Sequence, residues 1–309
     1  EFILADLTVN LGKLKLKNPV ITASGTFGYG MEYLEYCPPE KLGAVTVKGI
    51  SIFPWEGNRT PRTAEVFGGM LNSIGLQNPG VEKFINDSNY LPALKKRGAT
   101  VIVNIWGRTI DDYRNVAEIL DANSDGISAI EINISCPNIK EGGIAFGTDL
   151  HLAQRVVSAV RSVTSLPLIT KLSPNVTRIT DFASAVVDAG TDIISLINTL
   201  IGMAIDVKSR KPRIASVMGG FSGPAIKPVA VRMVYEVAKA VDVPIIGMGG
   251  ISSSEDAIEF LLAGADAIAV GTAIFADPEL PLKIIDGINN YLDNNSLRNV
   301  SEIIGKVQC

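Results

Sequence analysis

The chain has 309 residues, of which 47% are hydrophobic and 19% are charged, and its formal net charge is −4. This length fits one large domain or two ordinary ones, and the apolar fraction is enough for a sizeable core. The weakly acidic balance and the scattered basic residues argue against nucleic acid or an anionic membrane as a partner. The low charged fraction suggests that another protein covers part of the surface.

The numbers and spacing of cysteine and histidine limit the kinds of metal site and proton transfer that this chain can support. The three cysteines, Cys37, Cys136 and Cys309, form no C-x-x-C pair, so we expect no metal or iron–sulfur cluster in this chain. A reduced, cytoplasmic setting follows. The opening segment 1–6 has no basic region or long apolar run, so we expect no signal peptide, and no stretch reaches transmembrane length. The sequence holds one histidine, so proton transfer falls to cysteine or lysine.

The first predicted element is a hairpin of residues 7–9 and 14–16, which we expect to plug the bottom of a barrel. After it, the chain repeats one unit: a short β-branched run, a polar residue or glycine, and then a helical pattern. The predicted strands are 20–23, 44–47, 100–103, 130–132, 168–170, 193–197, 244–246 and 267–270. The predicted helices include 111–120, 152–163, 182–187, 229–241 and 257–262.

Apolar strands that alternate with helices are typical of a parallel sheet. Eight such units in this length predict an α/β fold, a closed (β/α)8 TIM barrel, with an open doubly wound sheet as the alternative. Two segments do not fit the repeat, 49–92 and 202–223, and the second is predicted to be a hairpin inserted before the seventh strand's helix. We expect inserted loops and strands at the C-terminal face, and a single domain over residues 1–309.

Polar side chains follow the predicted strands, at the end of a barrel where catalytic groups gather. Any one of them alone reads as a capping or loop residue, but together, with two lysines among them, they predict one polar mouth. These strand-end residues are Ser24, Lys48, Asn104, Asn133, Lys171 and Asn198.

The last two predicted strands end in glycine turns, 247–250 and 270–272. Glycine lets the backbone approach an anion closely, and helix N-terminal amides supply donors, so these turns predict a phosphate site. Two tight structural turns are the alternative reading. No dinucleotide fingerprint is present, because Ser252 stands where a third glycine would follow Gly247 and Gly249. A mononucleotide cofactor suits this pattern better than bound NAD.

Two cations and several amides at one mouth suit a flavin. A nearby ammonium, from Lys48 or Lys171, stabilises the negative charge of a reduced flavin's pyrimidine edge. The amides of Asn104, Asn133 and Asn198 match the donors and acceptors of a planar heterocycle. Lys171 has two alternative readings, a lysine in an ion pair inside the barrel and a Schiff-base lysine of an aldolase.

The segment 133–138, Asn-Ile-Ser-Cys-Pro-Asn, places a thiol where a predicted strand ends. A cysteine before proline is more often inert, but at this mouth Cys136 is positioned to act as the base that faces a flavin across the substrate. Cys37 and Cys309 keep the inert reading. The segment 140–147, with three glycines, is predicted to be a mobile lid, with a rigid glycine-rich turn as the alternative.

At these residues the chain resembles the class 1 dihydroorotate dehydrogenases, specifically the catalytic subunit of the NAD-linked 1B type, over nearly its whole length. Cysteine at 136 resembles class 1 rather than the membrane-associated class 2. The glycine-rich segment 142–143 and the block 222–228 resemble type 1B rather than the fumarate-linked type 1A. The matching motifs are 23–25, 47–48, 57–58, 61–62, 70–80, 133–138, 171–175, 197–199, 222–228, 247–250 and 270–272.

The resemblance implies oxidation of (S)-dihydroorotate to orotate, a step of de novo pyrimidine (UMP) biosynthesis, on bound FMN. It implies that Cys136 takes the proton from C5 while hydride passes from C6 to flavin N5, and that Lys48 and Lys171 also belong to the catalytic site. It implies that FMN is held by Ser24, Lys48, Gly49, Asn104, Asn133, Lys171, Ile197, Gly223, Gly249, Gly250, Gly271 and Thr272. It implies that the substrate is held by Lys48, Asn72, Ser73, Ile74, Gly75, Leu76, Asn133, Asn138, Asn198 and Thr199.

The resemblance also implies a partner. In this family, electrons leave through an iron–sulfur subunit that carries FAD and a [2Fe–2S] cluster and reduces NAD⁺, and we expect a homodimer within a heterotetramer. Trp106 is a departure, because the family usually has a small residue before the glycine that follows. Three rival functions are a dihydropyrimidine dehydrogenase-like subunit, a lysine aldolase using Lys171, and a non-catalytic phosphate-binding or scaffold barrel.

Overall fold

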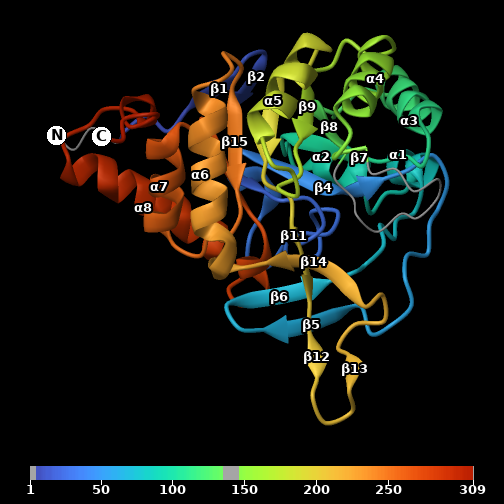
Figure 1. Ribbon diagram of the computed structural model, residues 1–309. Helices are drawn as coiled ribbons and strands as arrows, with labels where there is room; N and C mark the ends of the chain where they lie inside the picture. The colour runs from blue at the N-terminus through green and yellow to red at the C-terminus, as the bar shows by residue number, and fades with distance from the viewer. Residues whose placement is uncertain (1–4, 135–145, 309) are drawn as a thin grey trace.

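The computed structural model in Figure 1 describes residues 5–134 and 146–308. Its centre is a closed barrel of parallel strands that neighbour one another in chain order, with the last strand pairing with the first. The predicted closed barrel is confirmed, and the open-sheet alternative is wrong. The barrel strands are β3 (Val20–Thr22), β4 (Ala44–Ile50), β7 (Val101–Ile105), β8 (Ala129–Asn133), β9 (Leu168–Lys171), β10 (Ile193–Leu196), β15 (Ile245–Met248) and β16 (Ala267–Val270).

The barrel strands are apolar because they are covered on both sides. Every residue of β7 and of β8 is buried, and these strands consist mainly of valine, isoleucine and alanine. Side chains on one face fill the barrel and those on the other pack under helices, so a continuous apolar run replaces the alternating pattern of a half-exposed strand.

Helices surround the barrel, as Figure 1 shows. The five helices expected from the sequence are confirmed as α3 (Ile110–Ala122), α4 (Leu150–Arg161), α5 (Ile179–Asp188), α6 (Lys227–Ala238) and α7 (Ser254–Ala263). The remaining α-helices are α1 (Val81–Asn86), α2 (Leu91–Lys96) and α8 (Leu280–Asn294), and the sequence analysis did not identify α1 or α8. Side-chain caps begin several helices, for example Thr109, whose hydroxyl accepts from the Asp112 amide at 3.1 Å. No helix within residues 5–134 or 146–308 is long and apolar enough to cross a membrane.

The predicted N-terminal hairpin is present as β1 (Val9–Leu11) and β2 (Leu14–Leu16). Leu11 and Leu16 are fully buried and belong to the main core. Figure 1 shows the hairpin at the top of the view, at the end of the barrel opposite the four-stranded sheet. This placement confirms that it covers the barrel bottom.

The two segments that do not fit the repeat combine into one antiparallel sheet at the other end of the barrel (Figure 1). Its order is β11 (Leu200–Met203), β14 (Met218–Ser222), β6 (Gly69–Asn72) and β5 (Thr63–Val66). A small hairpin, β12 (Ile205–Asp206) and β13 (Lys211–Pro212), extends beyond it. The predicted hairpin at 202–223 is therefore confirmed, and the sheet that joins it to residues 63–72 is a finding of the structure.

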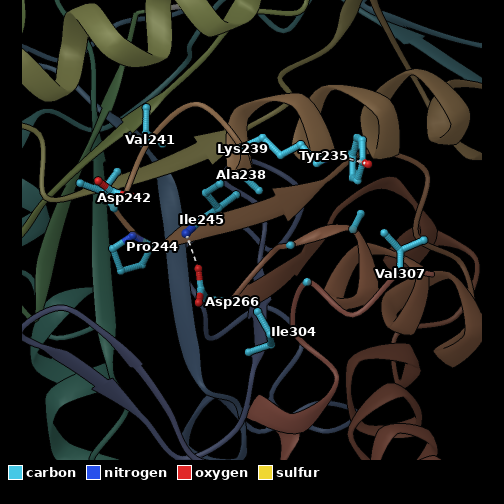
Figure 2. Close-up of a pocket in the computed structure, with 14 residues that line it drawn as sticks. Tyr235, Ala238, Lys239, Val241, Asp242, Pro244, Ile245, Asp266, Ile304 and Val307 are labelled. Carbon is cyan, nitrogen blue, oxygen red and sulfur yellow. Dashed lines mark hydrogen bonds between the residues drawn. The ribbon is translucent and has the colours of Figure 1, made fainter. Parts of the chain in front are cut away.

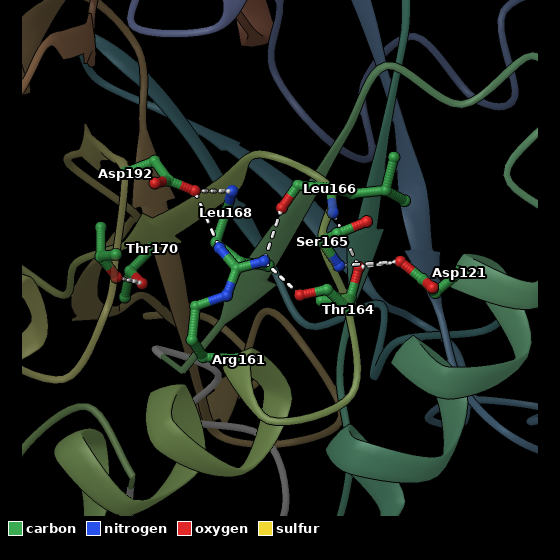
Figure 3. A network of polar contacts seen from close by, with 9 residues as sticks. Asp121, Arg161, Thr164, Ser165, Leu166, Leu168, Thr170 and Asp192 are labelled. Atoms are coloured by element: carbon green, nitrogen blue, oxygen red, sulfur yellow. Dashed lines mark hydrogen bonds and ion pairs between the residues drawn. The ribbon is translucent and has the colours of Figure 1, made fainter.

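Arg161, in the last turn of α4, fixes the loop that leads into β9 (Figure 3). Its guanidinium contacts the Asp192 carboxylate at 2.9 Å and donates to the carbonyls of Thr164 and, at 3.0 Å, Leu166. In the same loop the Thr164 hydroxyl donates to Asp121 at 2.6 Å, and this hydrogen bond lowers the pKa of the Asp121 carboxyl. The Arg161 guanidinium thus provides hydrogen bonds for two loop carbonyls that lie outside any helix or strand.

Replacing Arg161 with Met should lower the free energy of unfolding by about 2 kcal/mol, because charge-assisted hydrogen bonds to partly buried carbonyls are lost. Chemical denaturation of the purified protein measures this change. The control is Arg155→Met on the exposed side of the same helix, which should cost less than about 0.5 kcal/mol. Equal losses in the two variants would contradict the assignment.

A cavity of about 360 Å³ lies beside the start of β15, between the ends of α6 and α7 and the segment 304–307 (Figure 2). Asp266 lines it and accepts a hydrogen bond from the Ile245 amide at 2.8 Å. Burial raises the pKa of the Asp266 carboxyl above its ordinary value of 3.8. The native state therefore holds this proton more tightly than the unfolded chain does.

The raised pKa of Asp266 means that its ionisation costs stability as pH rises from about 4 through the folded-state pKa. Asp266→Asn does not ionise and can still accept from Ile245, so it should be more stable than the wild type at pH 7. The difference should shrink towards pH 4. Melting temperatures across this pH range test the sign, with Asp242→Asn, at an exposed position of the same cavity, as the control.

Candidate active site

The carboxyl ends of the barrel strands open towards the four-stranded sheet, because β10 leads directly into β11 through residues 197–199. Lys171, the last residue of β9, is 4% exposed, and its Nζ donates to Ser24 Oγ at 3.2 Å. Ser24 follows β3, so this bond brings together the first and fifth strands of the barrel. The predicted convergence of these two residues is confirmed.

Asn133 and Asn198 also meet at the mouth. Asn198 Nδ2 donates to Asn133 Oδ1 at 3.3 Å, and Asn198 Oδ1 accepts from the Thr199 amide at 2.8 Å. The Tyr113 hydroxyl donates to the Asn133 carbonyl at 2.7 Å, which anchors the end of β8 from α3. The sequence analysis did not single out Tyr113.

A buried carboxylate inside the barrel holds Asn104. Glu131 is 2% exposed, and its oxygens accept from Asn104 Nδ2 at 2.6 Å and from Ser195 Oγ at 2.8 Å. These residues come from β7, β8 and β10. The sequence analysis overlooked Glu131 and Ser195, although a carboxylate within the apolar run 129–132 was the available signal.

Two buried polar atoms beside this network lack a hydrogen-bond partner among the described residues, Asn104 Oδ1 and Trp106 Nε1. Both lie against Gly49 in β4. A Cβ built on Gly49 would be 2.8 Å from Asn104 Oδ1 and 3.8 Å from Trp106 Nε1, so no side chain fits there. The unusual Trp106 therefore packs directly beside two predicted cofactor residues.

Lys48 lies in β4, and its backbone amide donates to the Gly28 carbonyl at 2.9 Å. Burial and, secondarily, the nearby Arg62 guanidinium lower the pKa of the Lys48 ammonium, while Glu32 opposes them. A cation held partly out of water, with a second cation close by, is suited to an anionic ligand.

The predicted phosphate turns lie together. Gly223, Gly249 and Gly250 have φ values of +116°, +127° and +83°, which favour glycine. A Cβ on Gly250 would lie 2.9 Å from the Gly223 carbonyl oxygen, and one on Gly249 would lie 3.1 Å from Ile197 Cγ1. Thr272, which follows Gly271, donates to Ser222 at 2.7 Å. Three separate loops thus form one glycine-lined cradle.

The predicted substrate segment, 72–76, is anchored on both sides. The Ser73 amide donates to the Arg62 carbonyl at 2.7 Å, and the Ile74 carbonyl accepts from the Asn58 amide at 3.0 Å. Gly75 and Leu76 adopt positive φ of +74° and +61°.

Gly220 joins this segment to Thr199. It pairs with Asn72 across the sheet, and a Cβ on it would collide with Thr199 Oγ1. On the far side of Thr199, Asn175 Nδ2 donates to the Thr199 carbonyl at 3.1 Å. The sequence analysis included Asn175 in a motif but gave it no role.

Cys136, Asn138 and residues 140–145 of the predicted lid over 140–147 lie outside the described residues. Asn133, three positions before Cys136, is the last described candidate in that segment and lies at the mouth. Cys37 is fully buried, and burial raises the pKa of its thiol to about 12, which agrees with an inert cysteine. Among the described residues, no three His, Cys, Asp or Glu side chains gather as metal ligands.

Comparison with known proteins identifies the family. The family model described as Dihydroorotate dehydrogenase matches residues 6–292. A solved structure titled as DHODH in complex with ferulenol, from Eimeria tenella, shares the fold with a TM-score of 0.80 at 24% identity, over 97% of this chain and 88% of that chain.

Curated relatives are much more similar in sequence, and each is named Dihydroorotate dehydrogenase B (NAD(+)), catalytic subunit. The protein from Alkaliphilus metalliredigens (strain QYMF) is 56% identical over 303 residues, 98% of this chain and 99% of that protein. The protein from Geotalea uraniireducens (strain Rf4) is 55% identical over 97% of both. With a matching family model, a shared barrel and relatives of this similarity, the chain belongs to the dihydroorotate dehydrogenase family, among the NAD-linked B-type catalytic subunits.

Proposed function

We propose that this chain oxidises (S)-dihydroorotate to orotate with bound FMN, in de novo pyrimidine biosynthesis. The observation that carries the proposal is the polar mouth, where Lys171 contacts Ser24 and Asn198 contacts Asn133. Lys48 lies in β4, and the buried Asn104 acceptor lies in the neighbouring β7. Membership of the family supplies the reaction class. The same residues suit two ligands, a flavin and a pyrimidine, that are planar, form hydrogen bonds and carry negative charge.

The residues present fit FMN. The cradle at Gly223, Gly249 and Gly250 has no room for side chains, which suits close approach of backbone amides to a phosphate, and Thr272 bonds to Ser222 beside Gly223. A buried acceptor and a buried donor that lack partners among the described residues are available to hydrogen-bond the ring. We propose that the ring contacts Ser24, Lys48, Gly49, Asn104, Asn133, Lys171 and Ile197. When bound, FMN supplies a hydride acceptor.

The chain's own residues hold the substrate and move its proton. We propose that Cys136 removes the proton from C5 of dihydroorotate, since cysteine is the base that the family motif provides. Lys48 supplies a positive charge for the substrate carboxylate. The ring would be held by Asn72, Ser73, Ile74, Gly75, Leu76, Asn133, Asn138, Asn198 and Thr199. Lys171 places a second positive charge beside the cofactor and is positioned by Ser24.

Electrons must leave through another protein. The sequence has no complete dinucleotide fingerprint and no paired cluster cysteines. The relatives' printed name refers to NAD(+) and to a catalytic subunit, which supports a division of labour between chains. We propose a cytoplasmic complex with an iron–sulfur subunit that carries FAD and a [2Fe–2S] cluster, built around a homodimer of this chain within a heterotetramer.

The first test is flavin content and reduction. The purified protein should contain one FMN per chain, and dihydroorotate should bleach its absorption much faster than dihydrouracil. Cys136→Ala should slow this reduction by about 100-fold or more, because general-base catalysis is lost. Stopped-flow absorption under anaerobic conditions measures the rate.

Cys37→Ala is the control for that variant, because the Cys37 thiol is buried away from the mouth. It should leave the reduction rate within about twofold. An unchanged rate in Cys136→Ala would overturn the base assignment, and a purified chain without FMN would overturn the proposed function.

The second test concerns the electron acceptor. The chain purified alone should transfer electrons from dihydroorotate to a dye but should not reduce NAD⁺. Adding an FAD and iron–sulfur subunit should give NAD⁺ reduction. NADH formation, followed by absorption, is the measurement, and NADH formation by this chain alone would contradict the need for a partner.

A further inference from the structure

Two buried polar atoms beside Gly49 are suited to bind a ligand. Asn104 is fully buried and Trp106 is 1% exposed, yet Asn104 Oδ1 and Trp106 Nε1 have no partner within the described part of the chain. A buried polar atom without a hydrogen bond is unfavourable, and native proteins rarely leave one so. One atom is an acceptor and the other a donor, and both lie over Gly49.

The orientation of the Asn104 amide follows from its neighbour. A carboxylate can only accept, so Glu131 Oε1 at 2.6 Å must receive the Asn104 NH₂ group. Glu131 is itself held by the Ser195 hydroxyl at 2.8 Å. Asn104 Oδ1 therefore faces away from the carboxylate and is presented as an acceptor.

The Trp106 ring is equally constrained. Its backbone amide donates to the Ile50 carbonyl at 3.0 Å, and its ring packs edge-on against Trp55 with centroids 5.9 Å apart. Arg108 in turn lies over Trp55, 5.3 Å from the ring centroid. An indole held in this way cannot turn its N–H to solvent, and an indole nitrogen is a donor only.

We propose that Trp106 Nε1 and Asn104 Oδ1 form a donor–acceptor pair that binds the imide edge of the flavin ring, and that Glu131 is the positioning residue for the acceptor. An imide has an N–H between two carbonyls, so its N–H donates to Asn104 and a carbonyl accepts from Trp106. This inference rests on the proposed function, and it adds Trp106 and Glu131 to the residues proposed for the cofactor.

The pyrimidine substrate carries the same imide chemistry, so the position of the pair decides between the two ligands. Asn104 lies in β7 and Trp106 directly follows it, and both contact Gly49 of β4, which is proposed as a flavin residue only. The segment proposed for the substrate, 72–76, instead begins at Asn72, the last residue of β6 in the four-stranded sheet, and continues beyond it. The placement favours the flavin.

The main test follows the indole N–H directly. The chain has two tryptophans, so isotope labelling gives two indole resonances, and Trp55→Phe identifies that of Trp106. Adding FMN to the apoprotein should shift the Trp106 resonance downfield. Adding orotate to the apoprotein should not. This readout needs no turnover and works in the folded Trp55→Phe protein.

Affinity for FMN provides the second measurement. Trp106→Phe removes the donor but keeps a ring, and it should raise the dissociation constant of FMN about five- to tenfold, followed by quenching of flavin fluorescence. Trp55→Phe, the same chemical change at the neighbouring ring, should change it less than about twofold.

Glu131→Gln tests the positioning role. Glutamine can donate as well as accept, so the Asn104 amide is no longer held in one orientation. FMN should bind about three- to tenfold more weakly, and the flavin absorption bands should shift. Ser195→Ala, which leaves the Glu131–Asn104 bond in place, should have a smaller effect.

The outcomes separate the two proposals. If the wild type binds FMN but the Trp106 resonance does not move and Trp106→Phe binds FMN as tightly, the donor–acceptor pair is wrong while the proposed function stands. A resonance that moves with orotate and not with FMN also overturns the assignment to the flavin. If the wild type binds no FMN, both proposals fall.

Discussion

Closure of the barrel between β16 and β3 is the interaction on which the rest of the molecule depends. The pairing of Val270 with Thr22 turns an open row of strands into a ring, so the carboxyl ends of all eight strands face one opening. Lys171 reaches Ser24 only because strands far apart in the sequence are on opposite sides of that ring. The apolar strands follow from the same closure, since neither face of a closed sheet meets water.

The ring of strands positions the strand-end residues, and the inserted segments cover the opening of the barrel. Residues 63–72 follow β4 and residues 200–222 follow β10, and hydrogen bonds join the two segments into one sheet above the opening. Polar groups inside the barrel are kept in fixed orientations by their neighbours, as Glu131 shows by accepting from both Asn104 and Ser195. The polar groups inside the barrel and the sheet that covers the opening thus depend on different parts of the chain.

Local patterns were sufficient to predict the barrel, its hairpin plug and most strand-end residues, because strand and helix periodicity and strand order are written in short stretches. Glu131, Tyr113 and Ser195 were not predicted as site residues, since their roles depend on partners distant in the sequence. The sheet that joins β6 to β14 was not predicted either, because cross-strand pairing between two loops leaves no periodic signal. The role of Trp106 could not be read from its neighbours in sequence, since it depends on contact with Gly49 and Asn104.

The pairing of Asn72 with Gly220 sets the distance between the two flanks of the site. Asn72 ends β6, Thr199 directly precedes β11, and Gly220 of β14 lies between them without a side chain. Moving the pairing by one residue would displace one flank of the opening by about 3.4 Å and turn its side chains to the opposite face. The distance across the opening can therefore change only in steps of one residue along the β6–β14 pairing. An insertion in β6 or β14 must contain an even number of residues if the same side chains are to point inward.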